Sequence, residues 1–169
     1  MRNTTLLKKL IPALFLLLGL TGKAQPNVVP ADSSLNELFL EAGGIAGHLS
    51  FNYARHVGKS KNLLWRFGAG VILGGNKAIT IPAGVFYEKK FKNPHRMLEF
   101  GTGICLSGSP INNVVNSKSK ITSYYPYLAP TIAFKSRSPS GLSWRLAFDP
   151  LIGNEGILPW AGLSLGRSF

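Results

Sequence analysis

The sequence is poor in cysteine, in charged residues and in long apolar runs, and each shortage excludes a class of protein. Cys105 is the single cysteine among 169 residues, which leaves no internal disulfide and no cysteine-based zinc site. Charged residues make up 15% of the chain, against roughly 25% in a typical soluble domain. After residue 24 no apolar run approaches the ~18 residues of a membrane-spanning helix. The sequence therefore predicts no such helix in this part.

Acidic residues are scarce as well, with 7 Asp and Glu against 19 Lys and Arg and a net charge of +12. Four of the basic residues, Arg2, Lys8, Lys9 and Lys23, belong to the N-terminal segment. Positive charge alone is weak evidence for a nucleic-acid partner. The 19 glycines recur at strand period and not in a strand-to-helix turn. Neither nucleic-acid binding nor a phosphate-cradling loop is predicted.

The first 24 residues, MRNTTLLKKLIPALFLLLGLTGKA, have the pattern of a secretory signal peptide. A basic start precedes the apolar stretch Leu10–Leu20, and the small residues Gly22 and Ala24 precede a cleavage site before Gln25. Eleven apolar residues span only about 16 Å, too short to anchor in a bilayer. We predict a signal peptide over 1–24, a flexible leader over 25–35 and one exported domain over 36–169.

What the mature chain does have is alternation at period two, which indicates β-strands. Segments rich in Gly, Asn, Pro and Ser separate the strands, as turns require. A strand of ten residues is about 33 Å long, and tilting gives roughly the 25 Å height of a bilayer's apolar band. The predicted strands are Asn36–Ala42, His48–His56, Leu63–Leu73, Ile79–Glu88, Met97–Leu106, Ile121–Lys135, Leu142–Asp149 and Pro159–Phe169.

Each predicted strand has one large apolar face and one face of small, polar or charged residues. Leu142, Trp144 and Leu146, for example, alternate with Ser143 and Arg145. A soluble sandwich would show the same alternation, but its water-facing side is usually crowded with Lys, Glu and Thr and not with Gly and Ser. The pattern favours an all-β, closed, antiparallel, up-and-down, eight-stranded transmembrane β-barrel. The sixth strand, with Pro126 and Pro130, has ambiguous parity, and a bulge or edge irregularity is expected there.

The stretches FLEAGG, GHLSFNYARHV, LLWRFGAGVI, IPAGVFYEKK, LEFGTGI, GLSWRLAFDPLI and LPWAGLSLGRSF resemble a family of small bacterial outer-membrane β-barrel proteins. The chain is similar in build to the eight-stranded transmembrane domain of outer-membrane protein A. The resemblance implies a location in the outer membrane of a Gram-negative bacterium, among its lipids. It also implies that Phe169, with Leu165 and Leu163, is an assembly signal for the barrel-assembly machinery. Arg167 departs from the pattern, since an outward Tyr commonly fills that position.

Five of the seven acids share inward parity with two arginines, which predicts a charge network in the lumen. A charged pore or proton path is one interpretation. A paired polar core is favoured, because an eight-stranded barrel is only wide enough for its own side chains and unpaired buried charges are costly. The network comprises Glu37, Glu41, Arg66, Glu88, Glu99, Arg145 and Asp149.

His48 and Ser50 share one face, and eight-stranded lipid A deacylases use a His-x-Ser arrangement with an acid. At inward parity lipid A cannot reach the pair, so no catalytic residue is assigned and enzymatic activity is not favoured. The histidines lack ligand spacing, so no metal or cofactor is expected. The favoured role is structural or surface interaction through Ser107–Lys120 and Pro150–Leu158. A lipid-A-modifying barrel enzyme and a soluble periplasmic ligand-binding barrel remain alternatives.

Basic residues gather in the connections predicted to face the periplasm. A solvated rim is the favoured interpretation, and contact with anionic lipid headgroups is the alternative. These residues are Lys59, Lys61, Lys89, Lys90, Lys92, Arg96 and Arg137.

Overall fold

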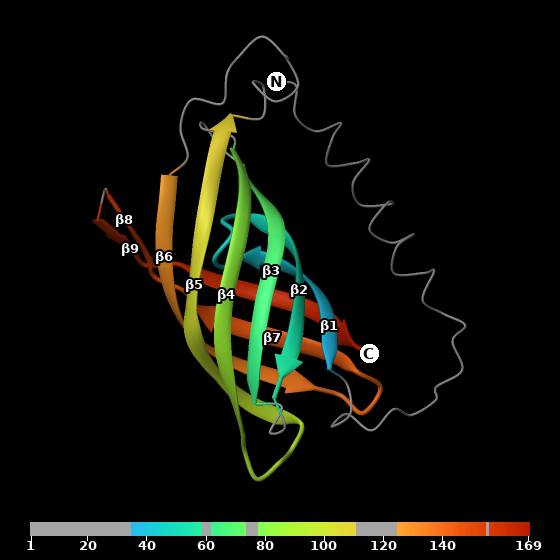
Figure 1. Ribbon diagram of the computed structural model, residues 1–169. Coiled ribbons are helices and arrows are strands. Elements are labelled where there is room, and N and C mark those ends of the chain that lie inside the picture. The colour runs from blue at the N-terminus through green and yellow to red at the C-terminus, as the bar shows by residue number, and fades with distance from the viewer. Residues whose placement is uncertain (1–34, 59–61, 74–77, 111–124, 155) are drawn as a thin grey trace, which may run out of the picture.

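A computed structural model describes residues 35–58, 62–73, 78–110, 125–154 and 156–169. This part of the chain is entirely β-structure and turns (Figure 1). It contains no helix that is long and apolar enough to cross a membrane. The strands are β1 (Asn36–Gly43), β2 (Leu49–Val57), β3 (Leu63–Ile72), β4 (Ala78–Lys90), β5 (Arg96–Pro110), β6 (Tyr125–Arg137), β7 (Leu142–Phe148), β8 (Leu151–Gly153), β9 (Gly156–Leu158) and β10 (Ala161–Ser168).

Eight strands, β1 to β7 and β10, close into an antiparallel barrel. Neighbours in sequence pair along the wall, and β1 pairs with β10 to close the ring, with Glu37 opposite Ser168. The backbones of Asn36 and Phe169 also exchange two hydrogen bonds of 3.2 and 2.9 Å. Both ends of the barrel sequence therefore lie at one rim, which we call the terminal end. The predicted fold class is confirmed.

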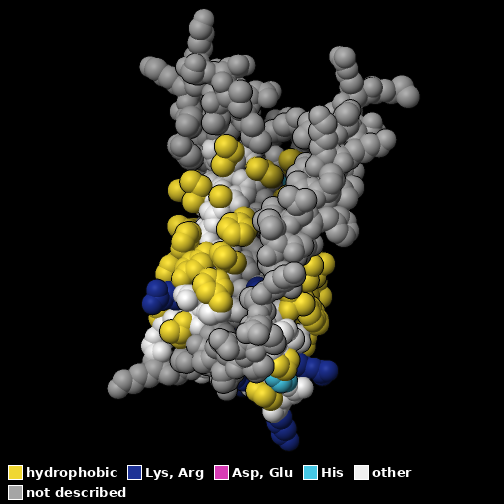
Figure 2. All heavy atoms as spheres, turned by 90° about the vertical axis from the view of Figure 1, so that its right-hand side faces the viewer, with side chains coloured by type: hydrophobic (Ala, Val, Ile, Leu, Met, Phe, Trp, Pro, Cys, Tyr) yellow, Lys and Arg dark blue, Asp and Glu magenta, His cyan; other side chains and the backbone are white. Residues whose placement is uncertain are grey.

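The wall has its large apolar side chains outside. Ile81, Leu146 and Leu165 are each more than half exposed, while the residues beside them in sequence point into the barrel. Figure 2 shows hydrophobic side chains along the height of the barrel, and Lys and Arg side chains in its lower half. Exposing such a surface to water would be unfavourable, since burial of apolar area is the main favourable contribution to folding. The predicted parity holds in β1, β3, β4, β5, β7 and β10.

Large aromatic rings are also present inside, which the parity rule did not predict. Phe39 and Phe86 are 5% and 1% exposed and point into the lumen. Phe86 fits because glycines lie beside it: a Cβ on Gly84 or Gly101 would come within 2.8 Å of its ring. The small residues of the inner wall thus make room for the few large side chains that fill it.

The turn between β1 and β2 folds back into the mouth of the barrel. Ile45 and Ala46 are 4% and 0% exposed, and the hydroxyl of Thr80 donates a 2.8 Å hydrogen bond to the Ala46 carbonyl. Gly43 and Gly44 have φ of 77° and 75°, a conformation that glycine adopts without strain. Ile45 and Ala46 therefore form an apolar cap inside the end of the barrel opposite the termini.

Two connections and the position of a register shift differ from the sequence prediction. The region Pro150–Leu158 is not a plain loop, because it contains the β8–β9 hairpin that projects from the barrel in Figure 1. β5 continues to Pro110, which shortens the predicted loop Ser107–Lys120, and residues 111–124 lie outside the described part. The register shift falls at Ala78 and Thr80 of β4 and not in β6.

The irregularity expected in β6 takes the form of a change of partner. β6 pairs with β5 along Tyr125–Ser136, but with β7 only from Ile132 to Arg137. In the part of β6 that precedes Ile132, the edge that does not pair with β5 pairs with β8 instead, with Leu128 opposite Ile152. Pro126 and Pro130 lie in this half of the strand, where the partner changes and a missing N–H is tolerated.

Candidate functional site

The structure places all seven predicted lumen residues inside the barrel. None is more than 4% exposed, and each belongs to an ion pair or a hydrogen bond with another inward side chain. With the residues that join them, they form two clusters stacked along the axis. Every one of the eight wall strands contributes to this network, because alternate residues of each strand point inward.

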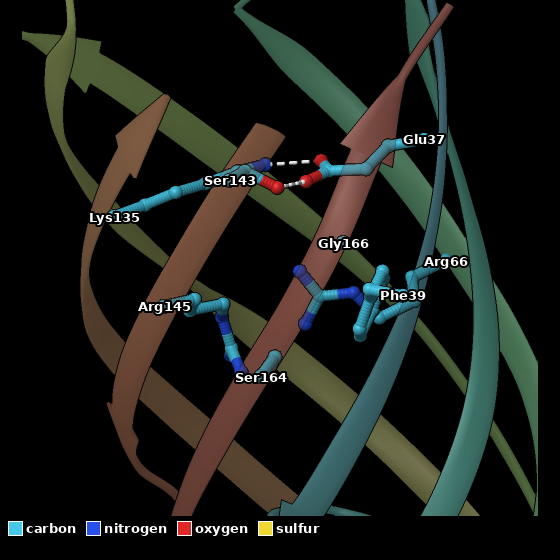
Figure 3. Close-up of a pocket in the computed structure, with 8 residues that line it drawn as sticks. All are labelled: Glu37, Phe39, Arg66, Lys135, Ser143, Arg145, Ser164 and Gly166. Carbon is cyan, nitrogen blue, oxygen red and sulfur yellow. Dashed lines mark hydrogen bonds and ion pairs between the residues drawn. The ribbon is translucent and has the colours of Figure 1, made fainter. Parts of the chain in front are cut away.

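The terminal-end cluster is organised around Lys135 of β6. Its ammonium group contacts the carboxylate of Glu37 on β1 and lies 2.7 Å from Glu88 Oε1 on β4. His56 Nε2 lies 2.8 Å from the other Glu88 oxygen, and the Ser143 hydroxyl donates to Glu37. Figure 3 shows Lys135 and Ser143 converging on Glu37. One buried cation thus links two acids that lie 98 and 47 residues away from it in sequence.

The central cluster is organised around Glu99 of β5. Arg66 Nη2 lies 3.0 and 2.9 Å from its two oxygens, and Arg145 Nε lies 2.8 Å from Oε1. Arg145 also reaches Glu41 Oε1 at 2.7 Å and Asp149 Oδ1 at 3.8 Å. The hydroxyl groups of Ser164 and Thr131 donate to these two acids. The cluster therefore consists of three acids, two arginines and two hydroxyls, all of which have inward partners.

Arg66 is held by aromatic rings as well as by charge. Its Cζ lies 4.8 Å from the centroid of Phe39 and 4.3 Å from that of Phe86. A guanidinium group stacks well on ring faces, and the attraction is largest where water is excluded. The rings and the arginine together fill the middle of the lumen.

A small cavity lies between the two clusters. The cavity between Glu37, Phe39, Arg66, Lys135 and Arg145 encloses about 10 Å³. That volume accommodates about one water molecule and no small-molecule ligand. The arrangement can neutralise buried charges and hold opposite walls of the barrel together.

Three members of the network were missed or misplaced by sequence reasoning. Lys135 was at the end of the predicted strand with ambiguous parity, and His56 was dismissed for lack of ligand spacing. Arg137 was assigned to the periplasmic rim, which is wrong, because it is 6% exposed and lies 3.6 Å from Glu37. The signal that could have placed Lys135 inside is the alternation of the outward Leu128, Ile132 and Phe134 with the inward Ala129 and Ala133.

The other basic rim residues lie as predicted where the structure describes them. Lys89, Lys90, Lys92 and Arg96 are exposed at the terminal end, while Lys59 and Lys61 lie outside the described part. The predicted signal peptide and residues 25–34 of the predicted leader also lie outside it, whereas Leu35, the last leader residue, accepts a 2.8 Å backbone hydrogen bond from His56.

The predicted His48–Ser50 pair does not come together. His48 is exposed and packs edge-on against Trp160, at 5.7 Å between ring centroids, and its Nδ1 accepts a 3.3 Å hydrogen bond from Leu73 N. Ser50 is buried and accepts from Asn52 Nδ2 at 2.7 Å. The inward parity assigned to His48 was therefore wrong. Within the described ranges no group of three His, Cys, Asp or Glu residues is arranged to hold a metal ion.

The residues predicted to form the assembly signal lie on the outer wall. Phe169, Leu165 and Leu163 are 56%, 61% and 51% exposed, and the backbone of Phe169 is tied to β1. Arg167 is exposed on the same outward side. Their role in assembly stays a prediction.

No protein-family model matches the chain, and no curated protein matches it. The structure is similar to the crystal structure of the N-terminal β-barrel domain of OprF from Pseudomonas aeruginosa, with a TM-score of 0.53 and 12% sequence identity. The match covers 79% of this chain and 95% of that domain. The two chains share an eight-stranded barrel fold. At this identity the likeness extends to the fold alone.

Proposed function

We propose that the chain is an exported protein of a Gram-negative outer membrane, with a plugged polar interior and a structural or surface-interaction role. The observation that carries the proposal is the inverted polarity of the barrel. All five carboxylates of the described residues are buried in the lumen, while leucine, isoleucine and phenylalanine side chains cover the outer wall. A bilayer satisfies such a surface, and a closed barrel satisfies every backbone group within it.

The aromatic residues of the outer wall support this orientation in a membrane. Tyr53, Trp65 and Phe67 form one cluster of rings, with centroids 5.1 to 5.6 Å apart, toward the terminal end. Phe134 and Trp144 form another, 5.5 Å apart, on the opposite part of the wall. Aromatic rings that encircle a barrel near its rim are typical of the membrane–water interface.

The packed lumen favours the interpretation of a plugged barrel and not that of an open pore. The terminal-end cluster, the central cluster and the apolar cap at Ile45 and Ala46 lie in series along the axis. The separation of His48 from Ser50 gives no support to a lipid-A-modifying enzyme, and the small cavity gives none to a ligand-binding barrel. The interaction role would use the external β8–β9 hairpin, in which Ile157 is 70% exposed.

Membrane fractionation tests the proposal most directly. We expect the mature protein in the outer-membrane fraction, resistant to extraction with alkaline carbonate, and we expect no steady single-channel conductance in planar bilayers. Recovery in the detergent-free periplasmic fraction would contradict the membrane location. Selective conductance would contradict the plugged interior. Loss of lipid A acyl chains on expression, abolished by Ser50→Ala, would support the enzymatic alternative.

A further inference from the structure

The exposed charged side chains of the described barrel have one sign and lie at one end. Its five carboxylates are all buried, so the exposed charged side chains of the described residues are basic. They are Arg55, Lys89, Lys90, Lys92, Arg96 and Arg167. All lie near the terminal end, either within three residues of a strand end or in the β4–β5 turn. This basic end would attract an anionic surface.

A groove of about 390 Å³ opens at this end. Its apolar lining is Leu142 and Trp144 of β7, Leu165 of β10 and Pro139 of the β6–β7 turn. Arg96 and Arg137 contribute its cations, and no carboxylate lines it among the described residues. Leu142, Trp144 and Leu165 are outward residues, so the apolar part is continuous with the hydrophobic outer wall.

Arg137 lines the groove and is only loosely paired with the acids on its lumen side. The side chain is 6% exposed, yet its Nε and one terminal nitrogen have no hydrogen-bond partner. Its nearest acids, Glu37 and Glu88, are 3.6 and 3.9 Å away and are already bonded by Lys135. A guanidinium group keeps its positive charge in proteins, so an anionic group in the groove would be attracted to Arg137 as well as to Arg96. An ionised phosphate, like a carboxylate, matches the donor geometry of a guanidinium group.

The groove also lies at the depth of lipid headgroups. Trp144 packs against Phe134, and Phe134 lies 6.3 Å from Phe91 in the β4–β5 turn. These rings form an aromatic cluster at the rim, where interfacial aromatic residues mark the headgroup level. A ligand here would have its polar part beside the turns and its apolar part along the wall.

We propose that this groove binds one anionic phospholipid, such as phosphatidylglycerol, in the leaflet at the terminal end. The phosphate would contact Arg96 and Arg137, and an acyl chain would lie along Leu142, Trp144 and Leu165. A lipid is favoured over a free anion because the cations adjoin an apolar wall that faces the membrane. The proposal rests on the membrane location proposed above.

Tryptophan quenching by brominated lipids tests the proposal on the whole mature barrel. The chain has 3 Trp residues, so Trp65→Phe with Trp160→Phe leaves Trp144 as the single reporter. Trp65 is the matched control reporter, left by Trp144→Phe with Trp160→Phe: each is the third residue of a strand that begins at the terminal end. Brominated phosphatidylglycerol and brominated phosphatidylcholine are compared in vesicles of unbrominated phosphatidylcholine.

We expect the fluorescence of Trp144 to be quenched more by brominated phosphatidylglycerol than by brominated phosphatidylcholine. This preference should be larger for Trp144 than for Trp65. Arg96→Gln should reduce that preference about fivefold, which corresponds to about 1 kcal/mol for one basic residue near an anionic headgroup. Arg96→Lys should retain much of it. Arg55→Gln, which removes the same charge beside Trp65, should leave Trp144 unchanged.

The outcomes separate the two proposals. Quenching of Trp144 by both lipids, with a preference equal to that of Trp65, would overturn the specific site but leave the membrane location intact. Absence of quenching by either lipid would contradict the membrane location itself. An undiminished preference in the folded Arg96→Gln variant would overturn the assignment of the phosphate to Arg96.

Discussion

Replacing Lys135 with methionine tests whether the lumen network holds the barrel together. The side chain is 2% exposed, and its ammonium group bridges acids on β1 and β4, two strands that do not touch each other in the wall. Methionine has a similar length and no charge, so Lys135→Met removes the charge with little change in volume. Glu37 and Glu88 then remain buried with fewer partners.

The expected loss of stability follows from the asymmetry of buried ion pairs. Removing one partner of such a pair costs about 3–5 kcal/mol, because the other charge remains without compensation. Arg137 stays within 3.6 Å of Glu37 and 3.9 Å of Glu88 and would take over part of the role. We therefore expect a loss near the lower end, about 3 kcal/mol.

Urea unfolding of the mature barrel in lipid vesicles, followed by tryptophan fluorescence, measures the loss. Lys89→Met is the matched control, since Lys89 is an exposed lysine on the neighbouring rim and its replacement should change stability by less than about 0.5 kcal/mol. Adding Glu88→Gln to Lys135→Met should recover part of the loss, because one uncompensated carboxylate is removed. A midpoint for Lys135→Met equal to that of Lys89→Met would refute the network's structural role.

Three further predictions concern other parts of the barrel. Arg66→Ala and Arg145→Ala should each lower the urea midpoint by about as much as Lys135→Met without creating channel activity in planar bilayers; unchanged midpoints would contradict their structural role. Deletion of Phe169 should sharply reduce insertion in cells and barely affect refolding in detergent, whereas equal losses in both assays would indicate packing alone. Gly43→Ala should destabilise more than Gly58→Ala. Both glycines have φ near 80°, but only at Gly43 would the new Cβ meet another atom, the Ala161 carbonyl oxygen at 2.1 Å, so equal urea midpoints would contradict the inward turn.

Part of this architecture could be predicted because it depends on local periodicity. In a β-strand, successive side chains point to opposite faces, so the positions of Glu99, Arg66 and Arg145 relative to their apolar neighbours indicated which faces were inside. The number of wall strands followed from the same alternation and the turn residues between segments. Strand ends were less predictable: β5 reaches Pro110, four residues past the predicted end at Leu106, because pairing with a neighbour decides how far a strand continues.

The pairing of the charges required the closed barrel. Parity indicates that a side chain is inside, but the register and stagger of all eight strands decide which strands face each other across the axis. Lys135 meets Glu37 from 98 residues away, a distance that local patterns do not encode. Arg137 was predicted to be a rim residue because its neighbours in sequence are Ser136 and Ser138. Only the folded barrel brings Glu37 and Glu88 close to it.

The amino-acid sequence by itself determined the inverted barrel, since alternation at period two and the choice of large or small residues are properties of each strand alone. The tertiary structure decided how the lumen is filled. Phe86 fits inside only because glycines of β4 and β5 lie beside it, and Ile45 is buried only because the β1–β2 turn folds inward. Both depend on the space left by other strands, and packing in a closed wall is a property of all its strands together.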